Sequence, residues 1–279
     1  MRTILAICLF ACFNVSAATA QEKGLAMPDA MVMIGQGKFV RGCSAATDPN
    51  CRSHERPAHE VVLGPFLIDR HETTVAEYKR CVDADKCTMP GTNQDNKRCN
   101  WGQEGRDLHP INCVDWAQAD AYCKWAGKRL PTETEWEKAA RSDDGRRYPW
   151  GGDRPNCDLA ITSRQDKGCG QSSTWPVCSV PKGNSPYGLC DMVGNVWEWV
   201  ADWYAADTYD AQNAQMDKET NELVKNPVGP SNGRERVLRG GSWTSKLPES
   251  VRTSTRFYFK PDVKLGNFGF RCADDLNIQ

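Results

Sequence analysis

The sequence predicts a single α+β domain with little regular secondary structure and many disulfides. In the first half of the chain, short strand signals precede three helix starts that carry capping residues. In the second half, from Gly151, glycine, proline, asparagine and aspartate are frequent and periodicity is weak. Such a long irregular span is uncommon in a compact domain unless function, disulfides or bound ions restrain it. With 14 cysteines among 279 residues, disulfides are the first candidate for that restraint.

The N-terminus has the pattern of a cleavable secretory signal peptide over residues 1–20. A basic start is followed by an apolar run over residues 4–15 and by an A-x-A end at residues 18–20. The run is too short to serve as a membrane-spanning anchor of the mature chain. We therefore expect an exported protein, periplasmic or extracellular, whose mature chain begins near Gln21. A lipid attached to Cys12, as in a lipoprotein, is the less favoured alternative.

Charge and hydropathy argue against two classes of partner. The formal net charge is −1, which provides no basic field for nucleic acid. No stretch beyond the signal peptide is apolar enough to cross a membrane, so we expect no membrane span. No linker, low-complexity tract or internal repeat interrupts the chain. We assign residues 21–30 to an N-terminal tail and residues 31–275 to one domain.

The cysteine count predicts a disulfide framework. Removal of the signal peptide takes Cys8 and Cys12 and leaves twelve of the 14 cysteines, an even number in a chain sent to an oxidising compartment. No C-x-x-C pair occurs, which argues against zinc ribbons and redox-active dithiols. The sequence does not fix the connectivity. Neighbouring cysteines suggest the pairs Cys43–Cys51, Cys87–Cys99, Cys157–Cys169 and Cys178–Cys190.

The expected strands and helices lie mainly in the first half. Short strands are expected over residues 31–34, 37–40, 61–63 and 66–68, where glycine and proline bound apolar runs. Capping boxes at helix starts are expected at Thr74 with Glu77, Asp115 with Gln118, and Thr132 with Glu135. The middle helix, over residues 116–126, carries a buried stripe and stops at Gly127. Residues 204–227 are polar and are expected to form a surface excursion.

The stretch from Gly188 to Tyr204 is expected to form the central strand and turn of the second half. Trp197 and Trp199 alternate with Glu198, which predicts a half-buried strand with one aromatic face and one acidic face. Asp191 and Glu198 flank a Gly-Asn turn, so their carboxylates and the intervening carbonyls could converge on one calcium ion. Spacing alone leaves another interpretation open, a turn into a core strand whose acids face water. The need to restrain the irregular second half favours calcium.

Seven motifs occur in the order found in one known family. They are His59-Glu-Val-Val62, Glu72-Thr-Thr-Val75 followed by Tyr78, Trp125-Ala-Gly-Lys-Arg-Leu-Pro-Thr-Glu133, Tyr148-Pro-Trp-Gly151, Gly194-Asn-Val-Trp-Glu-Trp199, Arg239-Gly-Gly-Ser-Trp243 and Phe270-Arg-Cys272. Over residues 31–273 the chain resembles the formylglycine-generating enzymes, also called sulfatase-modifying factors. The resemblance implies a variant of the C-type-lectin-like fold, with mixed α and β structure, much irregular chain and bound calcium.

The resemblance also implies metal sites and further disulfides. The first calcium site would take the side chains of Asp191 and Glu198 and the carbonyls of Gly194 and Val196. The second would take Asn156, the carbonyl of Cys157, Asp166 and Gly168. A family disulfide between the middle helix and the final strand corresponds to Cys123–Cys272. Cys81 and Cys113 are then left to form a Cys81–Cys113 bridge.

The family's catalytic positions are altered in this chain. Active formylglycine-generating enzymes bind copper(I) through two cysteines five residues apart and oxidise a substrate cysteine with dioxygen. The matching positions here hold Ser245 and Ser250. Because soft copper(I) selects thiolates, a neutral serine hydroxyl is a poor substitute. We therefore expect calcium rather than copper as the cofactor, and whether the chain is an enzyme at all stays open.

Other positions that line the family's cleft are recognisable. They are Trp197, Ser242, Arg252 and Asn267, together with Lys246 in place of a histidine. Each has a structural alternative, since Trp197 can be a core residue, Ser242 can close a turn and Asn267 can cap a loop. Together these residues predict a cleft rather than a mechanism.

Three functional hypotheses follow. The preferred one is an exported, calcium-braced domain without copper thiols that presents its cleft to a peptide or protein partner. The second is an oxidase of another substrate, a small-molecule ligand, similar to family relatives that mature the siderophore pyoverdine and also lack the paired thiols. The third is an active formylglycine-generating oxidase in which a free cysteine supplies the thiol, although the even cysteine count argues against it.

Overall fold

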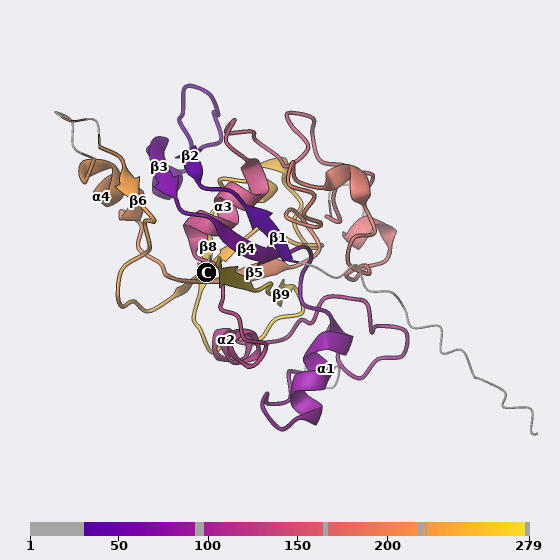
Figure 1. The fold of residues 1–279 in the computed structure, drawn as a ribbon. Helices are drawn as coiled ribbons and strands as arrows, with labels where there is room; N and C mark the ends of the chain where they lie inside the picture. The colour runs from indigo at the N-terminus through magenta and orange to yellow at the C-terminus, as the bar shows by residue number, and fades with distance from the viewer. Residues whose placement is uncertain (1–30, 93–97, 164–166, 217–219, 221, 277–279) are drawn as a thin grey trace, which may run out of the picture.

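The structure, a computed structural model, describes residues 31–276 except residues 93–97, 164–166, 217–219 and 221. Small sheets, short α-helices and long irregular connections make up the described chain (Figure 1). This confirms the mixed α and β fold, low in regular structure, that the sequence predicts. The predicted signal peptide, residues 1–20, and the tail, residues 21–30, lie outside the described residues.

The first sheet joins the two ends of the domain. Strands β1 (Met31–Ile34) and β10 (Ala273–Asp275) both pair antiparallel with β4 (Phe66–Asp69). Ile68 of β4 is completely buried. The start and the end of the domain are therefore held in one sheet.

Two further sheets complete the β structure. The second has the order β2-β3-β6, with β2 antiparallel and β6 parallel to β3, and the third has the order β8-β7-β5-β9. The strands are β2 (Gly37–Arg41), β3 (His59–Leu63), β6 (Val224–Lys225), β5 (Trp197–Trp203), β7 (Arg236–Arg239), β8 (Phe257–Phe259) and β9 (Phe268–Gly269).

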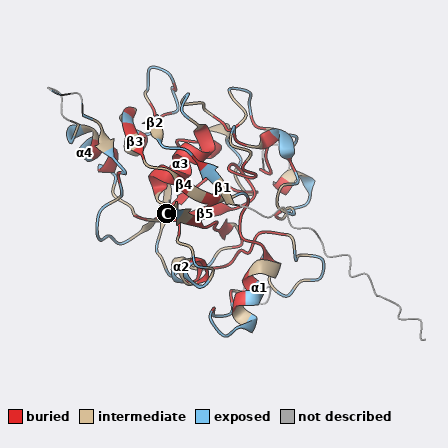
Figure 2. Ribbon diagram, viewed as in Figure 1, coloured by how far each residue is buried: buried red, intermediate tan, exposed pale blue. Residues whose placement is uncertain are grey.

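Strand β5 is buried on both faces, so the expectation of a half-buried strand is wrong. Trp199 packs in a cluster with residues of α1 and α2, and Val200 packs in another cluster with Trp136 of α3. Glu198 is also completely buried. The alternation itself is present, but helices cover both faces and β7 and β9 cover both edges. Figure 2 shows the buried residues concentrated in α3 and the strands beside it.

The three expected helices begin at their capping boxes. In each, the capping side chain accepts a hydrogen bond from the third helical N–H and the third helical side chain bonds back. The helices are α1 (Val75–Asp83), α2 (Trp116–Trp125) and α3 (Glu133–Arg141). Short 3₁₀ turns lie in the irregular connections, namely η1 (Ser53–Glu55), η2 (Lys167–Gly170), η3 (Pro181–Gly183) and η4 (Pro248–Val251).

Within residues 204–227, the described part is anchored more firmly than a polar surface excursion would be. It contains helix α4 (Thr208–Ala214), whose Tyr209 is completely buried. The guanidinium groups of Arg41 and Arg256 lie 4.2 and 4.4 Å from the centre of the Tyr209 ring, and its hydroxyl donates to Glu137 at 2.9 Å. One aromatic side chain among polar neighbours thus supplies the anchor.

Six disulfides join all twelve cysteines of the described residues. Four pairs agree with the sequence-based expectations, namely Cys43–Cys51, Cys123–Cys272, Cys157–Cys169 and Cys178–Cys190. The expected pairs Cys81–Cys113 and Cys87–Cys99 are wrong, because the bridges are Cys81–Cys87 and Cys99–Cys113. The chain reverses directly after α1, where the N–H groups of Lys86 and Cys87 donate to the carbonyl of Cys81. This turn brings Cys87 to Cys81.

The number of disulfides also indicates the redox conditions in which the protein folds. Six bridges in one domain point to an oxidising compartment. In the described part of the chain, no helix combines the length and the apolar character needed to cross a bilayer.

Candidate functional site

A cavity of about 450 Å³ is lined in part by residues that the family resemblance assigns to the catalytic cleft. Its lining combines four hydroxyl side chains, two aromatic rings, one leucine and two cations, and includes no acidic residue. The lining residues are Arg52, Trp197, Thr244, Ser245, Lys246, Leu247, Ser250, Thr255 and Phe257. The volume is in the range of pockets that hold small molecules or short peptide segments. We refer to this cavity as the serine pocket.

The two serines at the copper-thiol positions both line the serine pocket. The hydroxyl oxygen of Ser245 accepts a hydrogen bond of 3.0 Å from the backbone N–H of Ser242. This contact belongs to a tight turn, in which the N–H of Ser245 donates to the carbonyl of Ser242. Because every cysteine of the described residues is in a disulfide, no thiol there can replace the two hydroxyls.

Ser242 and Asn267 lie behind the pocket wall rather than in it. Ser242 is completely buried, and its hydroxyl lies 2.9 Å from the hydroxyl of Thr244, which does line the pocket. The side-chain amide of Asn267 donates to Thr244 at 3.2 Å and to Ser242 at 3.4 Å. These two predicted cleft residues therefore orient Thr244.

The apolar wall of the pocket is a stacked aromatic pair. Trp197, at the start of β5, and Phe257, at the start of β8, have ring centres 5.0 Å apart with an interplanar angle of 29°. Trp197 is only 8% exposed, so it is both a core residue and a pocket residue. Trp197 therefore packs in the core and also lines the pocket.

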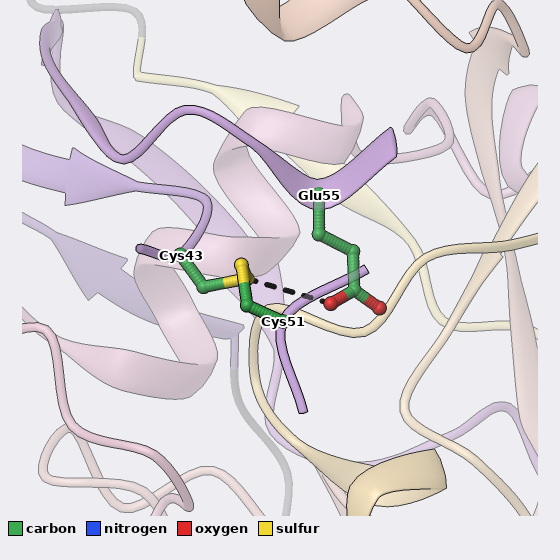
Figure 3. A group of neighbouring side chains, drawn as sticks. All are labelled: Cys43, Cys51 and Glu55. Atoms are coloured by element: carbon green, nitrogen blue, oxygen red, sulfur yellow. Dashed lines mark hydrogen bonds between the residues drawn. A yellow bond between two sulfur atoms is a disulfide. The ribbon is translucent and has the colours of Figure 1, made fainter. Parts of the chain in front are cut away.

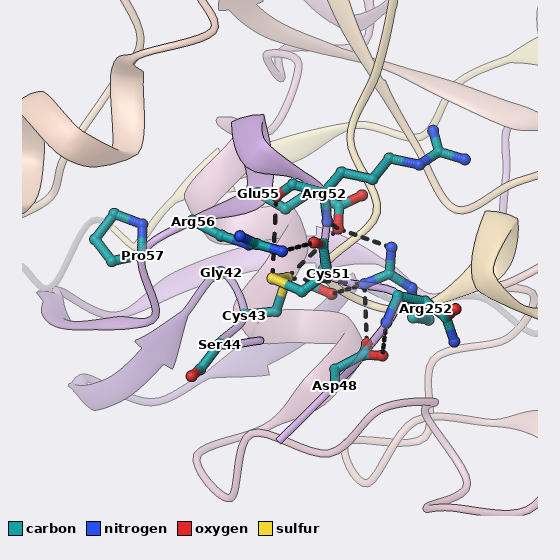
Figure 4. Close-up of a disulfide and its surroundings, with 12 residues drawn as sticks. Gly42, Cys43, Ser44, Asp48, Cys51, Arg52, Glu55, Arg56, Pro57 and Arg252 are labelled. Carbon is teal, nitrogen blue, oxygen red and sulfur yellow. Dashed lines mark hydrogen bonds and ion pairs between the residues drawn. A yellow bond between two sulfur atoms is a disulfide. The ribbon is translucent and has the colours of Figure 1, made fainter. Parts of the chain in front are cut away.

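Arg252 does not line the serine pocket as expected. It is completely buried and donates to Asp48 at 3.0 Å and to Glu55 at 2.7 Å, beside the Cys43–Cys51 disulfide (Figure 4). The Arg252 side chain also donates to the carbonyl of Glu249. It therefore ties the pocket segment, residues 244–257, to the loop over residues 43–55. Its side chain is directed into the interior because its carboxylate partners, Asp48 and Glu55, lie there.

The loop over residues 43–55 supplies a pocket residue that sequence reasoning missed. Arg52 lines the serine pocket, directly after Cys51 of the Cys43–Cys51 bridge. Nothing in the local sequence marks it, because its neighbours in the pocket lie about 145 to 205 positions further along the chain. The disulfide spacing was the one available signal that this loop is held in place.

Cys43, Cys51 and Glu55 also form a three-residue group with metal-ligand atoms in close range (Figure 3). Both sulfurs are consumed in the disulfide, and the Glu55 carboxylate is bonded to Arg252. A thiolate is the form of cysteine that binds metal. This arrangement is therefore a structural contact and not a metal site.

Comparison with known proteins identifies the family. The family described as sulfatase-modifying factor enzyme 1-like domain matches residues 16–276. The chain belongs to this family. It is 42% identical over 189 residues to the formylglycine-generating enzyme of Streptomyces coelicolor, and 35% identical over 260 residues to a Chlamydia caviae protein called serine/threonine-protein kinase pkn1.

This sulfatase-modifying factor domain spans only part of the length of the two relatives. The two matches cover 62% and 87% of this chain, but only 55% and 37% of the Streptomyces and Chlamydia proteins. Among solved structures, PvdO from Pseudomonas aeruginosa superimposes with a TM-score of 0.69 at 25% sequence identity. That match covers 88% of this chain and 94% of PvdO. The fold therefore extends over nearly the whole of that neighbour.

Two of the four positions of the first calcium set are buried acids with other partners. The Glu198 carboxylate bonds the guanidinium of Arg271 at 2.7 and 2.8 Å and accepts from the Trp136 indole at 2.8 Å. Asp191 accepts from the N–H of Cys178 at 2.7 Å. The carbonyls of Gly194 and Val196 belong to the turn between these two acids.

A third acid of this cluster, Glu72, was missed from the sequence. It accepts hydrogen bonds from Asn195 at 2.7 Å and from the N–H of Val196 at 3.1 Å. Burial, and then the charges of Asp191 and Glu198, raise the pKa of Glu72 well above its usual value. Burial also raises the pKa of Asp191. The Glu72-Thr-Thr-Val75 motif was the signal that could have marked this residue.

The described members of the second calcium set form local hydrogen bonds and a disulfide. The Asn156 side-chain oxygen accepts from the N–H of Asp158 at 2.8 Å, and the Gly168 carbonyl accepts from the Trp175 indole at 2.9 Å. Cys157 forms the bridge to Cys169. Asp166 lies outside the described residues.

Proposed function

We propose that this chain is an exported sulfatase-modifying factor domain that binds a peptide or protein partner in the serine pocket. It does not carry out copper-dependent oxidation of cysteine to formylglycine. The observation that supports this proposal best is that Ser245 and Ser250, at the two copper-thiol positions, both line the pocket. A hydroxyl that is neutral at pH 7 gives copper(I) neither the charge nor the softness of a thiolate.

Copper binding should therefore depend on restoring both thiols. The wild-type protein is expected to leave a chromophoric copper(I)–chelator complex intact. The double variant Ser245→Cys/Ser250→Cys is expected to remove about one equivalent of copper, because two thiolates suit copper(I). The measurement is the loss of chelator absorbance on titration with protein.

The single variants Ser245→Cys and Ser250→Cys are the controls, and each should compete far less well than the double variant. Free thiols counted in denatured, unreduced protein should be near zero in the wild type and two in the double variant. Tight copper(I) binding by the wild type, or conversion of a cysteine peptide to formylglycine, would contradict the proposal. Two free thiols in the wild type would instead favour the active-oxidase hypothesis.

We further propose that calcium braces the cluster of Asp191, Glu198 and the carbonyls of Gly194 and Val196. The support is chemical, since carboxylates with main-chain carbonyls are the ligands calcium prefers. It is also electrostatic. Glu72, Asp191 and Glu198 are buried together, and Arg271 forms an ion pair with Glu198. Calcium would compensate the remaining negative charge, while Glu198 would share its carboxylate with Arg271.

Calcium should raise the stability of the mature protein. At a free calcium concentration 100 times the dissociation constant, the expected gain is about 2.7 kcal/mol. The measurement is the melting temperature in calcium minus that in EDTA. Asp191→Ala should abolish this difference, whereas Asp210→Ala, at an exposed position on α4, should keep it. A wild-type protein that melts at the same temperature in calcium and EDTA would remove calcium from the proposal.

A second candidate function is oxidation of a small molecule. It is favoured by a relative named hercynine oxygenase, from Mycolicibacterium smegmatis, which is 32% identical to this chain over 277 residues. In this hypothesis the ligand would meet Trp197 and Lys246, while Ser242, Asn267 and Arg252 would support the pocket from behind. Oxygen uptake with catechols, tetrahydropyrimidines and thiol peptides tests it. Uptake with any of them that Lys246→Gln lowers would favour this function over simple partner binding, because Lys246 is exposed and lines the pocket.

A further inference from the structure

The serine pocket contains two cations whose charges are not balanced within the pocket. Arg52 and Lys246 are both exposed and both line it, and none of the nine lining residues is acidic. Neither forms an ion pair with another described residue, whereas nearby Arg252 is paired with Asp48 and Glu55. Two positive groups in one partly enclosed cavity attract an anionic ligand.

Arg52 is held in position by its backbone rather than by its side chain. The preceding residue, Cys51, is bridged to Cys43, and the N–H of Arg52 donates to Glu55 at 3.0 Å. The same Glu55 oxygen is bonded to Arg252 at 2.7 Å. Figure 4 shows the Arg52 side chain extending away from the disulfide and from the Arg252 cluster. The fixed backbone lowers the entropic cost of binding an anion, because only the side chain has still to be ordered.

The other lining residues determine which further groups of the ligand the pocket can bind beside the anionic group. The stacked rings of Trp197 and Phe257 form one wall, and Leu247, which is 56% exposed, lies at the pocket as well. An aromatic wall beside an exposed leucine is suited to an apolar or aromatic side chain. The hydroxyls of Thr244, Ser245 and Ser250 can bond the polar groups of a peptide backbone.

From these observations we infer that the serine pocket binds an acidic peptide segment. Arg52 and Lys246 receive a carboxylate of the peptide, and Trp197 and Phe257 receive a neighbouring apolar or aromatic side chain. The inference rests on the proposed partner-binding function and specifies the partner's chemistry. Arg52 has the larger role, because a guanidinium can bond both oxygens of one carboxylate.

The test begins with a random heptapeptide display library selected on the mature wild-type protein. Selected peptides are expected to combine Asp or Glu with a nearby aromatic or aliphatic residue. Synthetic peptides are then titrated by fluorescence anisotropy against wild type, Arg52→Gln, Lys246→Gln and Lys38→Gln. Lys38 is exposed on β2, in a different cavity, so Lys38→Gln removes an equal charge as a matched control. Since all three positions are exposed, the melting temperatures should match that of the wild type.

Arg52→Gln is expected to weaken binding of the selected peptides by about 10-fold to 100-fold, the range for a lost hydrogen bond to a charged group. Lys246→Gln should weaken it less, and Lys38→Gln should leave it unchanged. Replacing the peptide's Asp by Asn should reproduce the loss in wild type but add little in Arg52→Gln. This non-additivity identifies Arg52 as the carboxylate's partner.

The possible failures separate the inference from the proposed function. Selected peptides that bind Arg52→Gln, or that bind after Asp→Asn replacement, as tightly as before would overturn the acidic ligand and leave the peptide pocket standing. A selection that enriches no peptide whose binding Leu247→Ala weakens would overturn both, because Leu247 lines the pocket at an exposed position. Phenylacetate binding as tightly as the peptides would assign the pocket to a small acid and so overturn the peptide ligand.

Discussion

Replacing Glu133 with glutamine is expected to lower the free energy of unfolding by about 3 to 5 kcal/mol, as is typical when one partner of a buried ion pair is removed. Glu133 is completely buried at the first position of α3. Its carboxylate lies 3.0 Å from Arg41, 3.3 Å from Arg239 and 2.7 Å from Arg256. A neutral amide would leave these three buried guanidinium groups with too little negative charge.

Urea denaturation without reductant measures this loss, and Glu222→Gln is the matched control. Glu222 forms an exposed ion pair with Lys225, with side chains 64% and 67% accessible, so its loss should be below about 1 kcal/mol. A loss of that small size for Glu133→Gln would mean that Glu137, which also bonds Arg239, is sufficient for the network.

The same variant should change the acid sensitivity of the protein. Burial would raise the pKa of Glu133, but Arg256, Arg41 and Arg239 outweigh burial and hold it at about 2, against 4.5 for an ordinary glutamate. A pKa depressed in the folded state stabilises the fold above about pH 4.5, and this stabilisation is lost as the pH falls toward 2. The contribution is about 3 kcal/mol. Stability should therefore fall less steeply below pH 4.5 in Glu133→Gln than in wild type.

Removing the Cys123–Cys272 bridge is expected to cost more stability than removing any short bridge. These cysteines are 149 residues apart in sequence, whereas Cys81 and Cys87 are 6 apart. Loop-closure entropy predicts losses of about 5 kcal/mol for the long bridge and about 2 kcal/mol for the short one. The bridge also holds α2 to the chain just before β10, which lies in the sheet that joins the two ends of the domain.

The comparison uses paired alanine variants, Cys123→Ala/Cys272→Ala and Cys81→Ala/Cys87→Ala, in non-reducing urea. All four cysteines are buried, so both pairs remove similar sulfur packing, and the difference reports the loop. Equal losses in the two variants would assign the stabilisation to packing of the sulfurs rather than to chain entropy.

The correct and the wrong expectations differ in the sequence separation of the contacts on which they depend. The capping boxes at Thr74, Asp115 and Thr132 were predictable because each is completed by a residue three positions later. The wrong pairing of Cys81 arose because the turn that brings Cys87 back is set by backbone hydrogen bonds after α1. The half-buried assignment of β5 failed because a strand's sequence does not specify what covers its second face.

The candidate site likewise contains residues that the sequence predicted and residues that only the tertiary structure placed. Sequence order alone put hydroxyls at the two copper-thiol positions, Ser245 and Ser250, and both line the pocket. The other half of the pocket's chemistry was not visible, since Arg52 comes from a distant loop and Arg252 turns inward to Glu55.

The sequence by itself determined the family, the capped helices, the even set of cysteines and the hydroxyls at the copper-thiol positions. These features are set by residue identity or by contacts within a few positions. The tertiary structure alone decided which cations remain unpaired. Arg252 meets a carboxylate 197 positions away in the chain, whereas exposed Arg52 and Lys246 meet none among the described residues. Only the folded chain brings charges so distant in sequence within bonding range, and burial then makes pairing obligatory for Arg252.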